Sequence, residues 1–319
     1  MSRDGPVWPT LPRQGERRDK RTRERDRERD RAGAGTGAGA EPPRARSERP
    51  PAPPSAAPGD GDAARVRAPR RDELRVFGLN ACLAAFAARP QDLRKAYLAA
   101  SRMGALRELM AYCVAQRLGY RVVEDDDLAR LAGSQHHEGV VLDMRRPAEL
   151  ALEALLARLD PGAPACLLWL DGVGNPHNFG ALLRSAAHFG VAGVLLPHDS
   201  PLALSGAACR VAEGGAEAVP LVRLGAGAAA VGVLQTAGFS LAATLPQPER
   251  TQSLFDATLP ARTVFVLGAE REGMRAELIE RCDLRLTIPG SGRVESLNIA
   301  SAVAALLTTW TLRRSGESR

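Results

Sequence analysis

Short apolar runs alternate with helical or loop segments over the second half of the chain. Six such runs, each four to six residues long, occupy 165–170, 193–196, 218–222, 240–244, 263–268 and 284–288. Strands that alternate with helices form parallel sheets, and strands buried on both faces are continuously apolar. We therefore predict an α/β domain with a parallel sheet over residues 165–315.

A shorter alternation precedes this region. Residues 74–90 predict a short strand and then a helix that Pro90 ends, and residues 93–100 predict a second strand. An amphipathic pattern over 104–120 predicts a helix that Gly119 stops, and another apolar run lies at 138–145. This β-α-β-α-β pattern predicts a small α/β domain over 71–146. The short helix and the turn sequence "DPGAP" in residues 147–164 indicate a linker.

The composition of residues 1–70 differs from that of the rest. A mixed-charge run at 17–31 is followed by the Gly/Ala-rich stretch 32–40 and the Pro-rich stretch 42–58, a composition typical of a disordered tail. The formal net charge of +6 lies entirely in this tail, because acidic and basic residues balance over 71–319. Two interpretations stay open: a solvated spacer, or a non-specific RNA-binding arm that acts through counterion release.

Several protein classes are excluded by composition. No run of about 18 apolar residues occurs, so we expect no membrane span. The N-terminus has no apolar core segment and is rich in acidic residues, unlike a secretory signal or a mitochondrial transit peptide. Five widely spaced cysteines without a C-x-x-C pair indicate reduced thiols in a cytoplasmic protein. The five histidines do not have metal-ligand spacing, so we expect no metal site.

Unusual polar residues follow two of the predicted strands. Asn178 lies in the turn after 165–170, where it could cap the following helix, and Arg184 lies in the stretch "ALLRSAA". We expect Arg184 to be buried, which would require an anionic or carbonyl partner. Glu270 lies between Gly268 and Gly273 after the run 263–268. It could receive an amine, pair with Arg184, or simply begin a surface helix.

A third such segment, "IPGSGRVESLNIASAVAALL" at 288–307, passes from a loop into an apolar helix. It carries Ser296 and Asn298 at the helix start, where one cap is sufficient, so the second polar group needs another role. Ligands of parallel sheets bind beyond the carboxyl ends of the strands, so the three segments predict one pocket. A G-x-G-x-x-G motif after the first strand is absent, which argues against an ordinary dinucleotide fold.

The segments 175–186, 267–274 and 288–307 resemble the three signature motifs of the SpoU (TrmH-type) RNA methyltransferases of the SPOUT class. Residues 75–145 are similar to the small L30e-like substrate-binding domain of the same family. This resemblance implies a deep trefoil knot and methyl transfer from S-adenosylmethionine to a ribose 2′-hydroxyl of tRNA or rRNA. It also implies a homodimer through the knotted domain, with the helix 298–312 at the interface. The apolar positions of that helix fit this interface or the chain's own core: Ile299, Val303, Leu306, Leu307 and Trp310.

The resemblance also assigns residues. It implies cofactor contacts at Gly268, Ile288 and Leu297, largely through the backbone. The implied active constellation is Asn178, Arg184, Glu270, Ser296 and Asn298. In this interpretation Ser296 caps the helix and Asn298 faces the pocket.

Arg184 is the general base proposed for the family, yet arginine side chains are effectively always protonated, so a base role would need an unusually strong perturbation. We therefore favour a role in binding the target phosphate or stabilising the developing alkoxide. Gly290 stands where many family members carry methionine, which leaves the subfamily open. The expected partner is tRNA or rRNA, without DNA or membrane. The alternative is an RNA-binding protein of this fold with little catalysis, against which the intact constellation argues.

Overall fold

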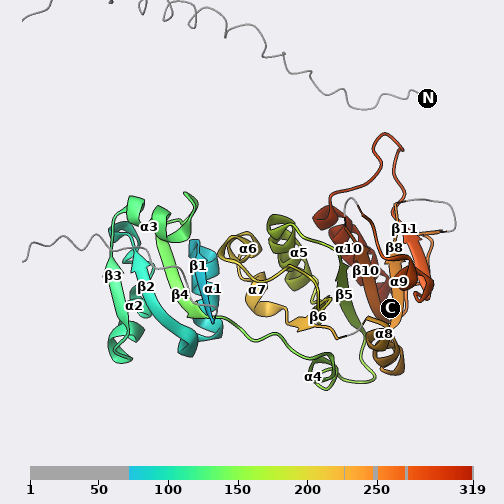
Figure 1. Ribbon diagram of the computed structural model, residues 1–319, viewed down its shortest axis with the longest axis horizontal. Coiled ribbons are helices and arrows are strands. Elements are labelled where there is room, and N and C mark those ends of the chain that lie inside the picture. Colours follow the sequence, from blue (N-terminus) through green and yellow to red (C-terminus); the bar gives the residue numbers. More distant parts are fainter. Residues whose placement is uncertain (1–71, 226, 247–250, 270–271, 318–319) are drawn as a thin grey trace, which may run out of the picture. The chain divides into compact units, whose positions relative to one another are not determined.

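A computed structural model describes residues 72–225, 227–246, 251–269 and 272–317 of the chain. The tail 1–70, for which the sequence predicts disorder, lies outside the described residues. Two separate β-sheets with their helices account for the described part (Figure 1). Within that part, no helix is long and apolar enough to cross a membrane.

The first sheet has four strands in the order β1-β4-β2-β3. These are β1 (Glu73–Phe77), β2 (Leu93–Leu98), β3 (Gly119–Val122) and β4 (Val140–Arg145). β4 is antiparallel to β1 and β2, whereas β2 and β3 are parallel. The connecting helices are α1 (Leu79–Ala88), α2 (Arg107–Ala115) and α3 (Asp125–Ala132), with 3-10 turns at Pro90–Asp92 and Ala100–Arg102.

The sequence pattern did not predict β3 as a strand, and it placed the end of α2 too late. α2 ends at Ala115 and not at Gly119, because Arg117 adopts the left-handed φ of 55° and reverses the chain. All four residues of β3 are exposed, so this edge strand carries no alternation of buried and exposed positions. A short strand is marked in a sequence by such alternation or by a continuous apolar run, and β3 has neither.

The second sheet has seven strands in the order β7-β6-β5-β10-β8-β11-β9, and every neighbouring pair is parallel. The bounds are β5 (Ala165–Asp171), β6 (Gly193–Leu196), β7 (Leu221–Arg223), β8 (Ser240–Thr244), β9 (Gln252–Ser253), β10 (Arg262–Gly268) and β11 (Leu284–Thr287). The parallel sheet and all six predicted strands are confirmed. Only β9, which has two residues, was not predicted.

Helices cover both faces of this sheet. Alternate residues of β5 divide between two cores, with Leu168 and Leu170 in one and Leu167 and Trp169 in the other. On the first face lie α5 (Pro176–His188), α6 (Gly206–Ala212), α7 (Gly215–Ala218) and α10 (Ile299–Glu317). On the second lie α4 (Leu152–Leu156), α8 (Gly227–Thr236) and α9 (Ala276–Glu280).

The apolar stripe of α10 is buried inside the chain itself. Its members pack in the core that also holds the buried residues of α5, so they are not available to a second subunit: Ile299, Val303, Leu306, Leu307 and Trp310. The opposite side of α10 borders a shallow groove of about 560 Å³ with Phe255 and Leu312, which are 56% and 67% exposed. Of the two interpretations of the stripe, the structure therefore favours the chain's own core.

Candidate active site

The three motif segments lie at one edge of the parallel sheet. They follow β5, β10 and β11. The carboxyl ends of these strands point the same way, because β10 is parallel to β5 and to β8, and β8 is parallel to β11. The segments after β5 and β11 meet directly. Asn298 Nδ2 donates a hydrogen bond of 3.0 Å to Asn178 Oδ1, although the two residues are 120 positions apart in the chain.

Asn298 is also the cap of α10. Its Oδ1 accepts a hydrogen bond of 2.9 Å from the backbone N–H of Ala300. The prediction that Ser296 caps this helix is therefore wrong, and Ser296 lies exposed in the loop before it. A single amide side chain performs both tasks because its oxygen faces the helix and its nitrogen faces α5.

The cap of α5 also differs from the expectation. Asn175 Oδ1 accepts a hydrogen bond of 2.9 Å from His177 N, and Pro176 occupies the first helical position. Proline suits this position because its missing N–H would have no partner inside the helix. Asn178 consequently stands in the first turn of α5, where its side chain reaches Asn298.

Arg184 is exposed, and the prediction that it is buried is wrong. Its neighbours Leu183 and Ala186 face the core, but Arg184 lies on the outer side of α5 with 59% of its side chain exposed. Its Nη2 lies 3.0 Å from Glu213 Oε2, and Glu270, the other candidate partner, lies outside the described residues. An exposed ion pair contributes at most about 1 kcal/mol, so a phosphate group can replace Glu213.

The backbone conformation of Glu213 is unusual. It ends α6 with φ 45° and ψ 47°, the left-handed region that costs a residue with a Cβ about 1–2 kcal/mol. This strain at the partner of Arg184 is consistent with a functional position.

Gly268, at the end of β10, allows the following loop to fold back tightly. Two hydrogen bonds between Ala269 and Gly273, of 2.8 and 3.1 Å, close the loop. A Cβ at Gly268 would lie 2.5 Å from Gly273 C and from Met274 N, which is too close for any other residue. Backbone groups therefore form this part of the edge.

The other two predicted cofactor residues lie at the ends of the third segment. Ile288 follows β11 and is half-buried against the core, whereas Leu297 precedes the cap of α10 and is 50% exposed. A large apolar side chain exposed beside the polar Asn178–Asn298 pair is available to contact a ligand.

Sequence reasoning missed the ion pair that joins β5 to the second segment. Asp171, the last residue of β5, is 2% exposed and accepts hydrogen bonds from Arg275 N at 3.0 Å and Arg275 Nε at 2.8 Å. The hydrogen bond to Asp171 raises the pKa of the Arg275 guanidinium above its ordinary value. The signal was an aspartate at the end of a wholly apolar strand, where a buried charge needs a partner.

The described residues of this edge include no cluster of metal ligands and no reactive thiol. Within the described ranges, no group of three or more His, Cys, Asp or Glu side chains could hold a metal ion. All five cysteines are free thiols, and burial raises the pKa of Cys209 to about 12.

A parallel sheet with three polar and glycine-containing loops at its carboxyl edge is the arrangement in which α/β proteins bind their ligands. Two family models match the chain: the SpoU rRNA Methylase family over residues 165–308, and RNA 2′-O ribose methyltransferase substrate binding over residues 75–150. The protein belongs to the SpoU family of RNA methyltransferases, which confirms the resemblance seen in the motifs.

Named relatives agree with this assignment. The chain is 38% identical over 252 residues to the uncharacterized tRNA/rRNA methyltransferase YfiF of Escherichia coli O157:H7, covering 78% of this chain and 71% of YfiF. It is 36% identical over 236 residues to the 23S rRNA (guanosine-2′-O-)-methyltransferase RlmB of Nitrosomonas europaea, covering 73% and 88%. The fold is that of the SpoU methyltransferase AviRb from Streptomyces viridochromogenes, solved with AdoMet, with a TM-score of 0.64, 22% identity and coverage of 77% and 92%.

Proposed function

We propose that this protein transfers the methyl group of S-adenosylmethionine to a ribose 2′-hydroxyl of tRNA or rRNA. Membership of the SpoU family supports the reaction class. The observation that carries the proposal for the site is the hydrogen bond between Asn298 and Asn178, which joins the first and third motifs beside the helix that bears Arg184.

The residues at the sheet edge fit the cofactor. A Cβ at Gly268 would fill the space of the returning loop in the second motif. Leu297, in the third motif, is 50% exposed. We assign Gly268, Ile288 and Leu297 to cofactor binding. When bound, S-adenosylmethionine supplies a methyl group on a positively charged sulfur.

The protein's own residues position the nucleophile and manage its charge. The ribose 2′-hydroxyl would accept the methyl group that S-adenosylmethionine supplies, with the hydroxyl proton passing to water. A guanidinium group is a permanent cation at physiological pH, so we assign Arg184 to the phosphate of the target nucleotide or to the developing alkoxide. Asn178 and Asn298 hold the reacting groups in line, which is where positioning accelerates a displacement. Ser296 and Glu270 complete the proposed constellation.

The architecture completes the proposal. β11 is separated from β5 by β8 and β10, yet α10 packs against α5, so the chain returns across the sheet edge after β11. This return supports the trefoil knot that is typical of the family. We propose an L30e-like substrate-binding domain over 71–146, a linker over 147–164 and the methyltransferase domain over 165–315.

The quaternary structure and location are also proposed. We expect a homodimer through the groove beside α10 that Phe255 and Leu312 border, since the other side of this helix is already buried. The five free thiols favour the reducing cytoplasm.

The test compares wild-type protein with Arg184→Ala. We expect methyl transfer to fall at least 100-fold, the scale of losing one group that stabilises transition-state charge, while RNA affinity stays within about tenfold. Arg107→Ala, at an exposed position on α2, is the matched control and should keep its activity. Transfer at nearly the full rate in Arg184→Ala would refute the assignment of this residue. RNA binding without transfer in the wild type would favour the non-catalytic alternative.

A further inference from the structure

A second basic site lies away from the motif loops. A cleft of about 910 Å³ is bordered by the end of β4, the linker after it, and α7 with the start of β7. Five arginines line it: Arg89, Arg94, Arg145, Arg146 and Arg158. Its volume lies in the range of about 300–1,000 Å³ that accommodates nucleotide-sized ligands.

Two of the five arginines build the cleft. Arg89 forms a bidentate ion pair with Glu217 of α7, at 2.7 and 3.0 Å, and donates to the carbonyl of Arg145 at 2.6 Å. Arg146 donates to two carbonyls, at 2.6 Å to Leu204 and at 3.3 Å to Glu73. Both side chains are therefore committed to holding the walls together.

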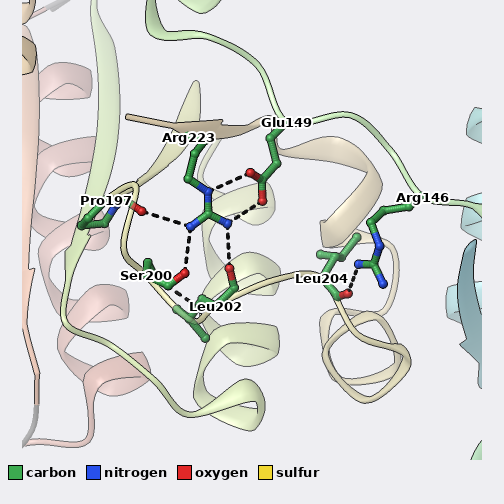
Figure 2. Close-up of polar contacts among 7 residues, drawn as sticks. All are labelled: Arg146, Glu149, Pro197, Ser200, Leu202, Leu204 and Arg223. Atoms are coloured by element: carbon green, nitrogen blue, oxygen red, sulfur yellow. Dashed lines mark hydrogen bonds and ion pairs between the residues drawn. The ribbon is translucent and has the colours of Figure 1, made fainter. Parts of the chain in front are cut away.

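An arginine outside the lining, Arg223 of β7, fixes the wall of the cleft that the linker forms. Figure 2 shows its guanidinium at the centre of a network, with Glu149 of the linker at 2.7 and 2.8 Å. It also donates to three carbonyls of the loop after β6, those of Pro197, Ser200 and Leu202. A cleft with such walls is preorganised, which lowers the entropy cost of binding.

The other three arginines are available to a ligand. Arg94 and Arg158 are exposed and show no ion pair within the described residues. Arg145 is 59% exposed, and its one ion pair, to Asp92, is long at 3.9 Å. Of the three acids that line the cleft, Glu149 and Glu217 are paired with Arg223 and Arg89, which leaves Asp72 against the three available arginines. The remaining charge is therefore positive.

The chemistry of the lining selects phosphate groups. No lining residue in the described part of the chain is aromatic, His, Asn or Gln, so the cleft offers no aromatic ring to stack on a base and no side-chain amide to read its edge. Guanidinium groups instead match phosphate oxygens. Contacts of this type position a nucleic acid without reading its sequence.

None of the three motif segments lines the cleft. Its α7 wall nevertheless packs against the helix that bears Arg184. Ala216, Glu217 and Ala218 line the cleft, and a Cβ at Gly215, the first residue of α7, would lie 3.0 Å from the Cα of Arg184. The cleft is therefore close to α5, although its lining is distinct from the motif residues.

We infer that this cleft binds the phosphate backbone of the RNA substrate beside the helix that bears Arg184, through Arg94, Arg145 and Arg158. The inference rests on the proposed function, because RNA is the polyanion that the enzyme would hold. RNA held both in the cleft and at the motif loops is fixed in register, which positions the target ribose.

The test is a charge-matched comparison in the full-length protein. One variant carries Arg94→Ala, Arg145→Ala and Arg158→Ala, which leaves the carbonyl of Arg145 in place for Arg89. The control carries three substitutions at exposed arginines outside the cleft: Arg107→Ala, Arg130→Ala and Arg281→Ala. The probe is a fluorescent 30-nucleotide oligouridylate titrated between 50 and 200 mM salt, with thermal melting to confirm that each variant is folded.

Each lost phosphate contact on single-stranded RNA should lower the slope of log K against log salt by about 0.7, or about 2 for three contacts. Over this salt range the wild type should lose about 15–20-fold more affinity than the cleft variant. In methyl transfer to RNA from cells lacking the protein, the cleft variant should show a higher KM and an unchanged kcat.

An unchanged slope, or an equal decrease in the control, would overturn the inference. So would displacement of the oligouridylate by millimolar uridine monophosphate, which would indicate a mononucleotide site. Absence of methyl transfer by the wild type would instead contradict the proposed function. The salt-slope titration measures RNA binding alone, so its result does not depend on methyl transfer.

Discussion

Asn298 allows the stability and the activity of the motif junction to be separated. In Asn298→Ala, α10 loses the cap bond to Ala300 N, worth about 1 kcal/mol, and the bond to Asn178, worth about 0.5–1.5 kcal/mol. We expect unfolding to become easier by about 2 kcal/mol, a decrease in Tm of roughly 4–8 °C for a chain of this size. Methyl transfer should also fall.

Asn298→Asp is the informative variant. Aspartate keeps an oxygen for the cap and favours the positive end of the helix, so the loss of stability should stay below about 1 kcal/mol. It replaces the donor facing Asn178 by a second acceptor, so the two side chains can no longer bond as they do at 3.0 Å. Transfer should therefore decrease as far as in Asn298→Ala. Thermal melting and transfer of labelled methyl measure the two effects. Equal destabilisation by Asp and Ala, or full activity of the Asp variant, would refute this reasoning.

Four further outcomes follow from the geometry. Glu213→Gly should relieve the left-handed strain, changing stability by less than about 1 kcal/mol in either direction, and should not lower transfer, because the target phosphate replaces Glu213 as the partner of Arg184; a tenfold loss of transfer would contradict this. Gly268→Ala should weaken cofactor binding at least tenfold in calorimetry, since its Cβ would meet backbone at 2.5 Å. Arg223→Ala should cost about 2 kcal/mol in urea unfolding, and Arg223→Lys should recover only part of it. Burial raises the pKa of Cys209 to about 12, so stability from this neutral thiol is complete below pH 9 and is lost as the pH rises towards 12. Cys209→Ala should flatten that decrease by about 1.4 kcal/mol per pH unit above 9.

The strands of the large sheet could be predicted because both of their faces are buried. In β5 every residue is buried, and a continuous apolar run of this kind stands out in the sequence. β3 has no buried residue, and β9 has two residues, so neither leaves such a signal. These two strands form because β3 pairs with β2 and β9 pairs with β11. Neither pairing leaves a pattern within the short strand itself.

The sequence indicates which residues belong to the candidate site, but it does not predict their contacts. Motif spacing identified Asn178 and Asn298, and the structure joins them across 120 positions. Which asparagine caps which helix depends on side-chain direction, so Asn175 and Asn298 took roles that were expected of Asn178 and Ser296. Apolar neighbours suggested that Arg184 is buried, yet a helix turns each successive residue by about 100°, and this one faces outward.

The burial of α10 shows the same limit for an interface. An apolar stripe predicts that a helix face is covered, and the sequence does not say by what. In the structure Val303 and Trp310 pack within the chain, and the exposed side of the helix is the one that carries Leu312.

The most direct test of the central claim is transfer of labelled methyl from S-adenosylmethionine to total RNA from cells lacking the protein. The RNA is separated into tRNA and rRNA, and the labelled nucleoside is identified after digestion. We predict a 2′-O-methylated nucleoside in one of the two fractions, absent with Arg184→Ala. A label on a base instead of a ribose would contradict the proposed reaction, and so would the absence of both transfer and cofactor binding.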